Sequence, residues 1–315
     1  MKHLLLLSGE CCELAKAELE LFAGAKAIEQ DGNVLIADAE KFDYSRPAFT
    51  KISAVFLFSC KKNELEKKIK EFEWQKYYKG SFFVRLVHIE QSMAGRIADI
   101  IWKKLKNPKV DFKNPKSVFV FIQQKDNVYC GLLLNENTEK FHARKAHKRP
   151  AFSPVSLHPK LARAVVNLTG IKKGIILDPF CGTGGILIEA GLMKLKPIGS
   201  DIDADMLKKA KTNLEALKIK SYKLLKKDAT TIKIKADAVA TDPPYGKASS
   251  LHKQNMKKLY SEFLANAYNI LKKKSRLVII FPNGISVKSK FKIIKRINIP
   301  IHKSLTRTIN VLEKR

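Results

Sequence analysis

The sequence predicts an α/β protein with a doubly wound parallel sheet at the C-terminus and an α+β domain ahead of it. Short apolar runs between residues 174 and 240 have the length of buried strands. A glycine-rich turn follows the first run, and an aspartate stands at or near the end of each. In such a Rossmann-like sheet the carboxyl ends of the strands meet at one ligand-binding crevice.

The N-terminal elements mix strands and helices, which is typical of an α+β domain. The turn signal Asp31-Gly32 precedes one strand, and Asp126-Asn127 closes a hairpin. The predicted strands are residues 4–7, 33–36, 81–87, 117–122 and 128–134, and the predicted helices are 12–22 and 93–102. Nothing in this third indicates catalysis, and we expect its aromatic residues in the core.

A charged, proline-containing segment at residues 135–154 joins the two halves, as a linker does. Its basic residues include Arg144, Lys145, Lys148 and Arg149. We predict that these four contact an RNA backbone, because the segment lies directly ahead of the predicted sheet. An inert linker is the alternative.

The charge of the chain favours a nucleic-acid partner. It has 315 residues, with 60 Lys and Arg against 30 Asp and Glu, and a formal net charge of +30, which supports phosphate binding and electrostatic steering. No apolar run has membrane-spanning length, and residues 1–7 are too short for a signal peptide. The five cysteines and seven histidines show no metal-ligand spacing. We expect a cytoplasmic protein with reduced thiols and no structural metal.

The glycine-rich turn, Asp178-Pro-Phe-Cys-Gly-Thr-Gly-Gly185, connects a strand at residues 174–177 to a helix opening at 186–190. Glycines let a ligand approach the backbone and meet free N–H groups. The spacing is not that of the dinucleotide G-x-G-x-x-G, and no Gly-Lys-Ser/Thr follows as in a P-loop. The turn therefore predicts a different ligand.

Three further strands lead to aspartates: residues 197–200 to Asp201, 222–225 to Asp228, and 238–240 to Asp242. An acid at the tip of the second strand is placed to bind ribose hydroxyls, which is the expected role of Asp201, with Asp203 as its rival. Any one of these acids taken alone is more often a helix cap or turn residue. Together with Asp178 they predict four acids facing one crevice.

The last acid begins the segment Asp242-Pro243-Pro244-Tyr245. Consecutive prolines cannot continue a strand, and their carbonyls remain as acceptors where the strand ends. Asp242 and a proline carbonyl can accept the two hydrogens of a planar amino group, and Tyr245 can cover the ring that bears it. The alternative is a loop with an exposed acid and a packed tyrosine.

In this order, the motifs resemble those of class I S-adenosylmethionine-dependent methyltransferases that act on exocyclic amino groups. The resemblance implies S-adenosylmethionine as cofactor, with Gly182 and Gly184 against its methionine part, Asp201 on the ribose and Asp228 at the adenine edge. The predicted cofactor-binding residues are Asp178, Phe180, Gly182, Gly184, Asp201, Asp228, Ala229 and Asp242. The predicted catalytic residues are Asp242, Pro243, Pro244 and Tyr245.

Residues 149–163 (RPAFSPVSLHPKLAR) and 304–313 (SLTRTINVLE) further resemble the archaeal tRNA guanine-N2 methyltransferases that carry a THUMP domain. This resemblance implies methylation of the N2 amine of guanosine 10 in tRNA, with one or two methyl groups added. It also implies four parts: a small α+β piece at 1–50, a THUMP-like RNA-binding domain at 51–134, a basic linker at 135–154 and a catalytic domain at 155–315.

Three alternatives remain open. An adenine-N6 methyltransferase on RNA or DNA fits the motif order, although the Asp242 carboxylate offers only acceptors and so suits the N1–H and N2–H donors of guanine better. A protein glutamine methyltransferase usually has Asn in place of Asp242. A non-catalytic RNA-binding relative is disfavoured by the intact Gly182, Gly184 and Asp201.

Overall fold

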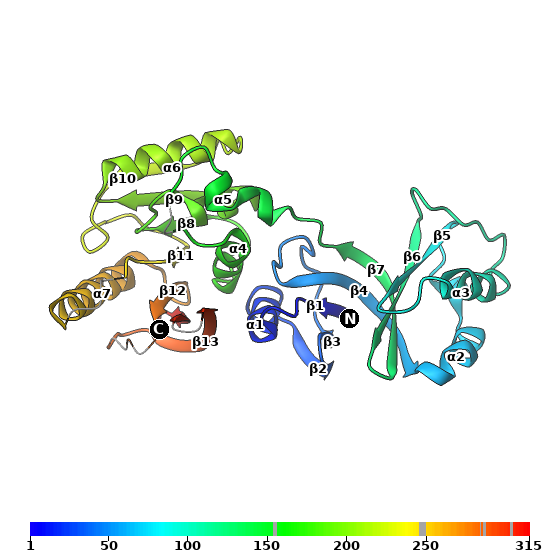
Figure 1. Cartoon of the computed structure of the whole chain (residues 1–315). Coiled ribbons are helices and arrows are strands. Elements are labelled where there is room, and N and C mark those ends of the chain that lie inside the picture. Colours follow the sequence, from blue (N-terminus) through cyan, green and yellow to red (C-terminus); the bar gives the residue numbers. More distant parts are fainter. Residues whose placement is uncertain (154–155, 246–249, 284, 286–287, 303–304) are drawn as a thin grey trace. The chain divides into compact units, whose positions relative to one another are not determined.

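The computed structural model describes residues 1–153, 156–245, 250–283, 285, 288–302 and 305–315 (Figure 1). The chain falls into two compact units. The N-terminal unit comprises residues 1–15, 23–45 and 49–138, and the C-terminal unit comprises 16–22, 46–48 and 139–315.

The N-terminal unit is built on a seven-stranded sheet in the order β2-β3-β1-β4-β7-β6-β5. Neighbouring strands are antiparallel, except for the parallel pair β5 and β6. The strands are β1 (Lys2–Leu7), β2 (Lys26–Asp31), β3 (Val34–Asp38), β4 (Thr50–Lys61), β5 (Phe82–Val87), β6 (Ser117–Gln124) and β7 (Asn127–Glu136). The sheet crosses the predicted boundary at residue 50, and the division into domains stays a prediction.

Helices α2 and α3 pack on this sheet. The helices in this part of the chain are α1 (Cys12–Ala23), α2 (Leu65–Glu71) and α3 (Met93–Trp102), with short 3-10 turns at Lys62–Glu64 and Trp74–Lys76. Ile97 and Ile101 of α3 meet Trp74, Phe119 and Phe121 in one buried cluster. Most aromatic side chains here therefore belong to the core, as expected; Phe112, which is 78% exposed, is an exception.

The C-terminal unit contains a second seven-stranded sheet, in the order β10-β9-β8-β11-β12-β14-β13. Its first five strands are parallel, β14 is antiparallel to β12, and the edge strand β13 is antiparallel to β14. The strands are β8 (Ile175–Asp178), β9 (Lys196–Asp201), β10 (Lys223–Lys226), β11 (Ala238–Thr241), β12 (Arg276–Pro282), β13 (Lys292–His302) and β14 (Leu305–Glu313). The predicted doubly wound sheet is present.

Helices cover both faces of this sheet, and Figure 1 shows α6 and α7 on opposite sides of it. The helices are α4 (Pro159–Leu168), α5 (Gly185–Leu192), α6 (Ala204–Ala216) and α7 (Ser250–Ile270). On one face, Phe263 and Leu264 of α7 pack on Leu177 and Val239. The other face has a separate cluster that includes Leu187 of α5 and Leu214 of α6. β8 and β11 are largely buried between the two helix layers, which explains the short continuous apolar runs that mark them in the sequence.

The sheet order gathers the four predicted aspartates at one edge. Asp178 ends β8, Asp201 ends β9, Asp228 follows β10, and Asp242 directly follows β11. Because β10, β9, β8 and β11 are consecutive parallel neighbours, their carboxyl ends lie along the same edge of the sheet. This edge carries the candidate site.

Candidate active site

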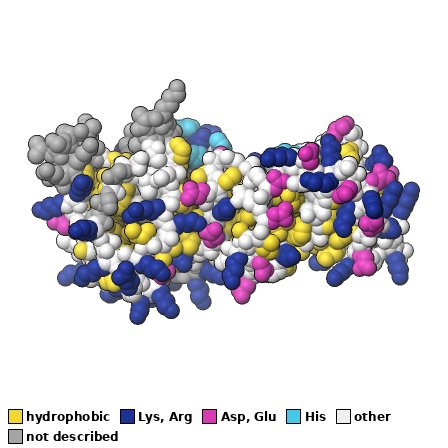
Figure 2. Space-filling view, turned by 90° about the horizontal axis from the view of Figure 1, so that it is seen from below, with side chains coloured by type: hydrophobic (Ala, Val, Ile, Leu, Met, Phe, Trp, Pro, Cys, Tyr) yellow, Lys and Arg dark blue, Asp and Glu magenta, His cyan; other side chains and the backbone are white. Residues whose placement is uncertain are grey.

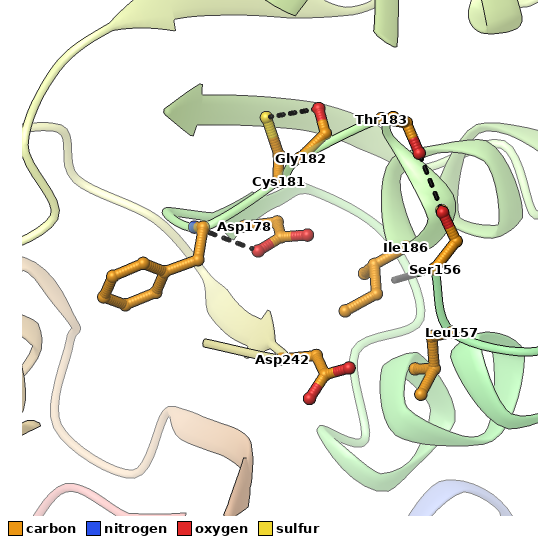
Figure 3. Close-up of a pocket in the computed structure, with 10 residues that line it drawn as sticks. Ser156, Leu157, Asp178, Cys181, Gly182, Thr183, Ile186 and Asp242 are labelled. Carbon is orange, nitrogen blue, oxygen red and sulfur yellow. Dashed lines mark hydrogen bonds between the residues drawn. The ribbon is translucent and has the colours of Figure 1, made fainter. Parts of the chain in front are cut away.

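A cavity lies at the carboxyl edge of β8 and β11 (Figure 3). It encloses about 350 Å³ of empty space, counting open solvent at its mouth. Figure 3 shows Asp178 below the glycine turn and the Asp242 carboxylate on the neighbouring strand end. The lining residues are Ser156, Leu157, Asp178, Phe180, Cys181, Gly182, Thr183, Gly185, Ile186 and Asp242. The glycine turn and the start of the double-proline segment therefore share one cavity.

The glycine turn needs glycine at two positions because its backbone is left-handed there. Gly182 has φ 48° and Gly184 has φ 84°, a region in which residues with a Cβ are strained. Gly184 caps the N-terminus of α5. A Cβ built on Gly182 would meet no atom within 4 Å. The turn thus presents open backbone to the cavity.

Asp201 holds this turn in place. Its Oδ2 accepts a hydrogen bond of 2.9 Å from the Gly182 N–H, and its Oδ1 accepts one of 3.0 Å from Asp203. Asp203 instead caps α6, since its side chain accepts from the Asp205 N–H at 2.8 Å. Of the two rivals, Asp201 is the one tied to the glycine turn.

Asp178 lies at the floor of the cavity with 2% of its surface exposed. Its Oδ1 accepts hydrogen bonds from the Thr241 hydroxyl at 2.7 Å and from the Phe180 N–H at 3.2 Å. Burial raises the pKa of Asp178 to about 7, although both donors act in the opposite direction. The Thr241 bond links the end of β11 directly to the end of β8.

The double-proline segment is fixed by hydroxyl donors. Tyr245 donates to Asp242 Oδ1, and Tyr260 of α7 donates to the Pro244 carbonyl at 2.8 Å. Burial raises the pKa of Asp242, while the Tyr245 hydroxyl and the positive charge of Arg307 oppose that rise. Burial also raises the pKa of Tyr245, with Asp242 adding to the effect, so the phenol remains a donor.

Arg307 of β14 is a site residue that sequence reasoning did not assign, although it lies in the segment 304–313 that carries the family resemblance. Its Nη1 lies 3.4 Å from Asp242 Oδ2, and its guanidinium carbon lies 4.9 Å from the centroid of the Tyr245 ring. β14 pairs with β12 so that Arg307 is opposite Pro282, and β12 separates β14 from β11, the strand that leads to Asp242. A single arginine 65 positions away carries no local sequence signal of this role.

Four of the predicted cofactor residues lie outside the lining of this cavity: Gly184, Asp201, Asp228 and Ala229. Asp228 is exposed, and its Oδ1 accepts two bonds of 2.7 Å from the N–H and hydroxyl of Thr230. Ala229 is buried, and its carbonyl accepts from the Asn266 amide at 2.9 Å. Phe180 lines the cavity and packs edge-on against Phe263 at 5.1 Å.

The basic segment ahead of the sheet is more buried than its charge suggests. It forms two short 3-10 turns, Phe141–Arg144 and Ala146–Lys148. Lys148 is exposed and Lys145 is half-buried, whereas Arg144 is 11% and Arg149 7% exposed. Burial leaves Arg144 and Arg149 little surface for an RNA backbone, so we retain that prediction for Lys145 and Lys148 only.

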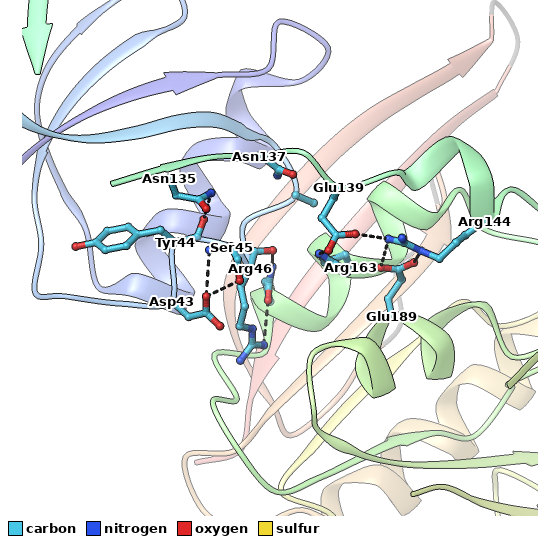
Figure 4. Close-up of polar contacts among 12 residues, drawn as sticks. Asp43, Tyr44, Ser45, Arg46, Asn135, Asn137, Glu139, Arg144, Arg163 and Glu189 are labelled. Atoms are coloured by element: carbon cyan, nitrogen blue, oxygen red, sulfur yellow. Dashed lines mark hydrogen bonds and ion pairs between the residues drawn. The ribbon is translucent and has the colours of Figure 1, made fainter. Parts of the chain in front are cut away.

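Arg144 belongs to a buried ion cluster, shown in Figure 4. Glu189 of α5 is fully buried and pairs with Arg144 Nε at 2.8 Å and Arg163 Nε at 3.0 Å. Glu139, which is 35% exposed, contacts the same two arginines at 2.9 and 3.3 Å. The cluster fastens the segment to α4 and α5.

Arg149 is also buried, but it does not belong to this ion cluster. Its Nε donates to the Arg144 carbonyl at 2.8 Å, but Nη1 and Nη2 have no hydrogen-bond partner among the described residues. They lie 3.4 and 3.7 Å from the point where Gly185 would carry a Cβ. Since Gly185 lines the cavity, the two unpaired Nη donors of Arg149 lie beside the cavity.

Within the described part of the chain, no three His, Cys, Asp or Glu side chains are grouped as metal ligands. None of the described helices is both long enough and apolar enough to cross a membrane.

Two family models match the chain. An RMKL-like methyltransferase domain model matches residues 146–295, and a DNA methylase model matches residues 37–212. The second match ends before Asp242, so it bears on the glycine turn and not on the double-proline segment. Both describe methyltransferases, in agreement with the predicted enzyme class.

Relatives and solved structures extend the match to the whole chain. The tRNA (guanine(10)-N2)-dimethyltransferase of Methanothermobacter thermautotrophicus is 34% identical and is covered completely, as is this chain. Its counterpart in Pyrococcus abyssi is 37% identical over 78% of each protein. The crystal structure of TrmN from Thermus thermophilus matches all of both chains with a TM-score of 0.53 at 20% identity, which shows a shared fold. The chain belongs to the family of tRNA (guanine(10)-N2)-dimethyltransferases, the family that its sequence motifs predicted.

Proposed function

We propose that this methyltransferase acts in the cytoplasm and dimethylates the exocyclic N2 amine of guanosine 10 in tRNA. Family membership supports the reaction, and the names of the relatives support the position and the number of methyl groups. One structural observation carries the proposal for this chain: Gly182 of the glycine turn and Asp242 line the same cavity. A methyl donor and an amine must meet in such a shared space.

S-adenosylmethionine is the cofactor of this enzyme class; when bound, it supplies a sulfonium methyl group whose carbon an amine lone pair can attack, with the neutral thioether as leaving group. The residues present fit it. The open backbone at Gly182 leaves room for a ligand, Asp201 stands where ribose hydroxyls bind, and the unpaired Nη atoms of Arg149 suit a carboxylate. We assign the methionine end to Arg149, Gly182 and Gly184, with Asp228 and Ala229 towards the adenine.

The double-proline segment is the proposed amine site. Asp242 and the Pro243 carbonyl accept the two N2 hydrogens, and these acceptors stabilise positive charge as it develops on the nitrogen. The Tyr245 hydroxyl bond fixes the rotamer of Asp242, which aligns the amine with the methyl group. Because burial raises the pKa of Asp242, its carboxylate accepts the departing proton more readily than an exposed one.

The N-terminal unit is proposed as a THUMP-type RNA-binding domain, with residues 51–134 as its main part. The net charge of +30 supports an RNA partner, and Figure 2 shows many Lys and Arg side chains on the face in view, with Asp and Glu among them. Lys145 and Lys148 are the proposed backbone contacts ahead of the catalytic domain.

The test incubates the purified protein with isotope-labelled S-adenosylmethionine and unmodified tRNA transcripts, then maps modified nucleosides by mass spectrometry. We expect N2,N2-dimethylguanosine at position 10. Asp242→Ala should abolish turnover while the affinity for the demethylated cofactor product changes less than about threefold. Methyl groups on adenine N6 would overturn the assignment of the base.

A further inference from the structure

Arg307 lies beside the proposed amine site and has N–H donors that are available for a further hydrogen bond. Its Nη1 is 3.4 Å from Asp242 Oδ2, which is longer than the usual separation of about 2.7–2.9 Å in a charge-assisted hydrogen bond. Its Nε is buried and has no partner among the residues that the structure describes. A guanidinium carries five N–H donors and no acceptor. The loosely paired Arg307 can therefore donate to a further acceptor near Asp242.

The Asp242–Arg307 pair is rigidly supported. The side chains are 15% and 17% exposed, the Arg307 guanidinium covers one face of the Tyr245 ring, and Tyr245 donates to Asp242. Contacts among Asp242, Tyr245 and Arg307 thus hold one carboxylate and one guanidinium next to each other. The pair therefore places a carboxylate acceptor and guanidinium donors next to each other.

This arrangement complements the Watson–Crick edge of guanine. That edge carries N2–H and N1–H donors followed by the O6 acceptor, whereas adenine carries N6–H donors followed by the N1 acceptor. Resting on the proposed function, we propose that Arg307 is a specificity-determining residue, which donates a hydrogen bond to O6 of the target guanine while Asp242 accepts from N1–H and N2–H. Arg307 thereby selects the base, and Asp242 with Pro243 selects the amine on it.

A substrate lacking O6 tests this assignment. Kinetics are measured for wild type and Arg307→Met on tRNA with guanosine at position 10 and on tRNA with 2-aminopurine riboside there, which keeps the N2 amine but has neither the O6 oxygen nor the N1 hydrogen. Because wild type and variant lose the N1–H contact alike, the comparison between them isolates the contact to O6. Arg307→Met should lower kcat/KM about 10- to 100-fold on guanosine, the scale of one hydrogen bond to a charged donor, and less than about threefold on 2-aminopurine. Arg307→Lys, which keeps a charged donor, should retain part of the preference for guanosine.

Two controls separate recognition from other losses. Arg296→Met removes an exposed arginine from the neighbouring β13 and should leave the ratio of the two substrates unchanged. Thermal unfolding and binding of S-adenosylhomocysteine report whether each Arg307 variant is folded. Equal losses on both substrates would show that Arg307 only positions Asp242 and Tyr245, and the inference would then be wrong while N2 methylation stood. Wild type that leaves guanosine 10 unmethylated would instead refute the proposed function.

Discussion

Substitution of Arg149 tests how the protein binds the methionine end of the cofactor. The perturbation is Arg149→Met, which keeps the aliphatic length of the side chain and removes the guanidinium. Nη1 and Nη2 are buried, unpaired among the described residues and next to Gly185 of the cavity. Because a buried charged donor without a partner is unfavourable, we expect both atoms to bind the carboxylate of the methionine end.

The expected magnitude follows from those two donors. A hydrogen bond to a charged group contributes about 1.5–3 kcal/mol, so two of them contribute at least about 3 kcal/mol. We therefore expect a net loss of about 3 kcal/mol, which is roughly a 100-fold weaker dissociation constant.

The assay is isothermal titration calorimetry with two ligands. S-adenosylhomocysteine carries the carboxylate, whereas 5′-methylthioadenosine has the same adenosine end and no amino-acid part. Arg149→Met should weaken the first ligand about 100-fold and the second less than about threefold. The exposed Lys148, changed to Met, is the matched control and should affect neither. Equal weakening of both ligands, or unchanged binding of the first, would refute the reasoning.

Two predictions concern stability, both measured by urea denaturation of the protein without ligand. Burial raises the pKa of Asp178 from 3.8 to about 7, so the folded wild type holds a proton that the unfolded chain releases, and its stability falls as the pH rises through this window. At about 1.36 kcal/mol per pKa unit, Asp178→Asn should have the same free energy of unfolding as wild type near pH 3 and one about 4 kcal/mol higher above pH 7. A difference between variant and wild type that does not change with pH would contradict this. Glu189→Gln should lower the free energy of unfolding by about 3 kcal/mol, because it removes a fully buried charge between Arg144 and Arg163. Glu139→Gln, at a more exposed position, should lower it by less than about 1 kcal/mol, and equal losses would show that burial is not the deciding factor.

The catalytic half was predictable because its signals are local. An apolar run that ends in an aspartate marks a strand tip, and a parallel sheet brings successive tips to one edge; Asp178, Asp201 and Asp242 lie where this reasoning put them. β4 and β2 were not predicted. β4 is a central strand whose residues follow no simple alternation of burial, and nearly every residue of the edge strand β2 is exposed.

The parts that could not be predicted depend on partners far away in the sequence. Arg144 and Arg149 look like a surface strip in a basic segment, but Glu189, 45 positions after Arg144, draws Arg144 into the interior. Arg307 reaches Asp242 only because β14 pairs beside β12. Charge and spacing reveal which groups are present, whereas burial and pairing across the sheet determine what those groups contact.

The partly or fully exposed Asp201, Asp228 and Asp242 form an acidic rim along one edge of the sheet on a basic protein, and a rim of this charge favours cationic ligands. A cationic donor is attracted to this rim, and the neutral thioether left after transfer is attracted less. The proposed RNA partner would be repelled by this rim, which favours entry of a single base without its phosphate backbone. Exchange of used for fresh donor and exclusion of an RNA backbone are therefore expected of the same three carboxylates.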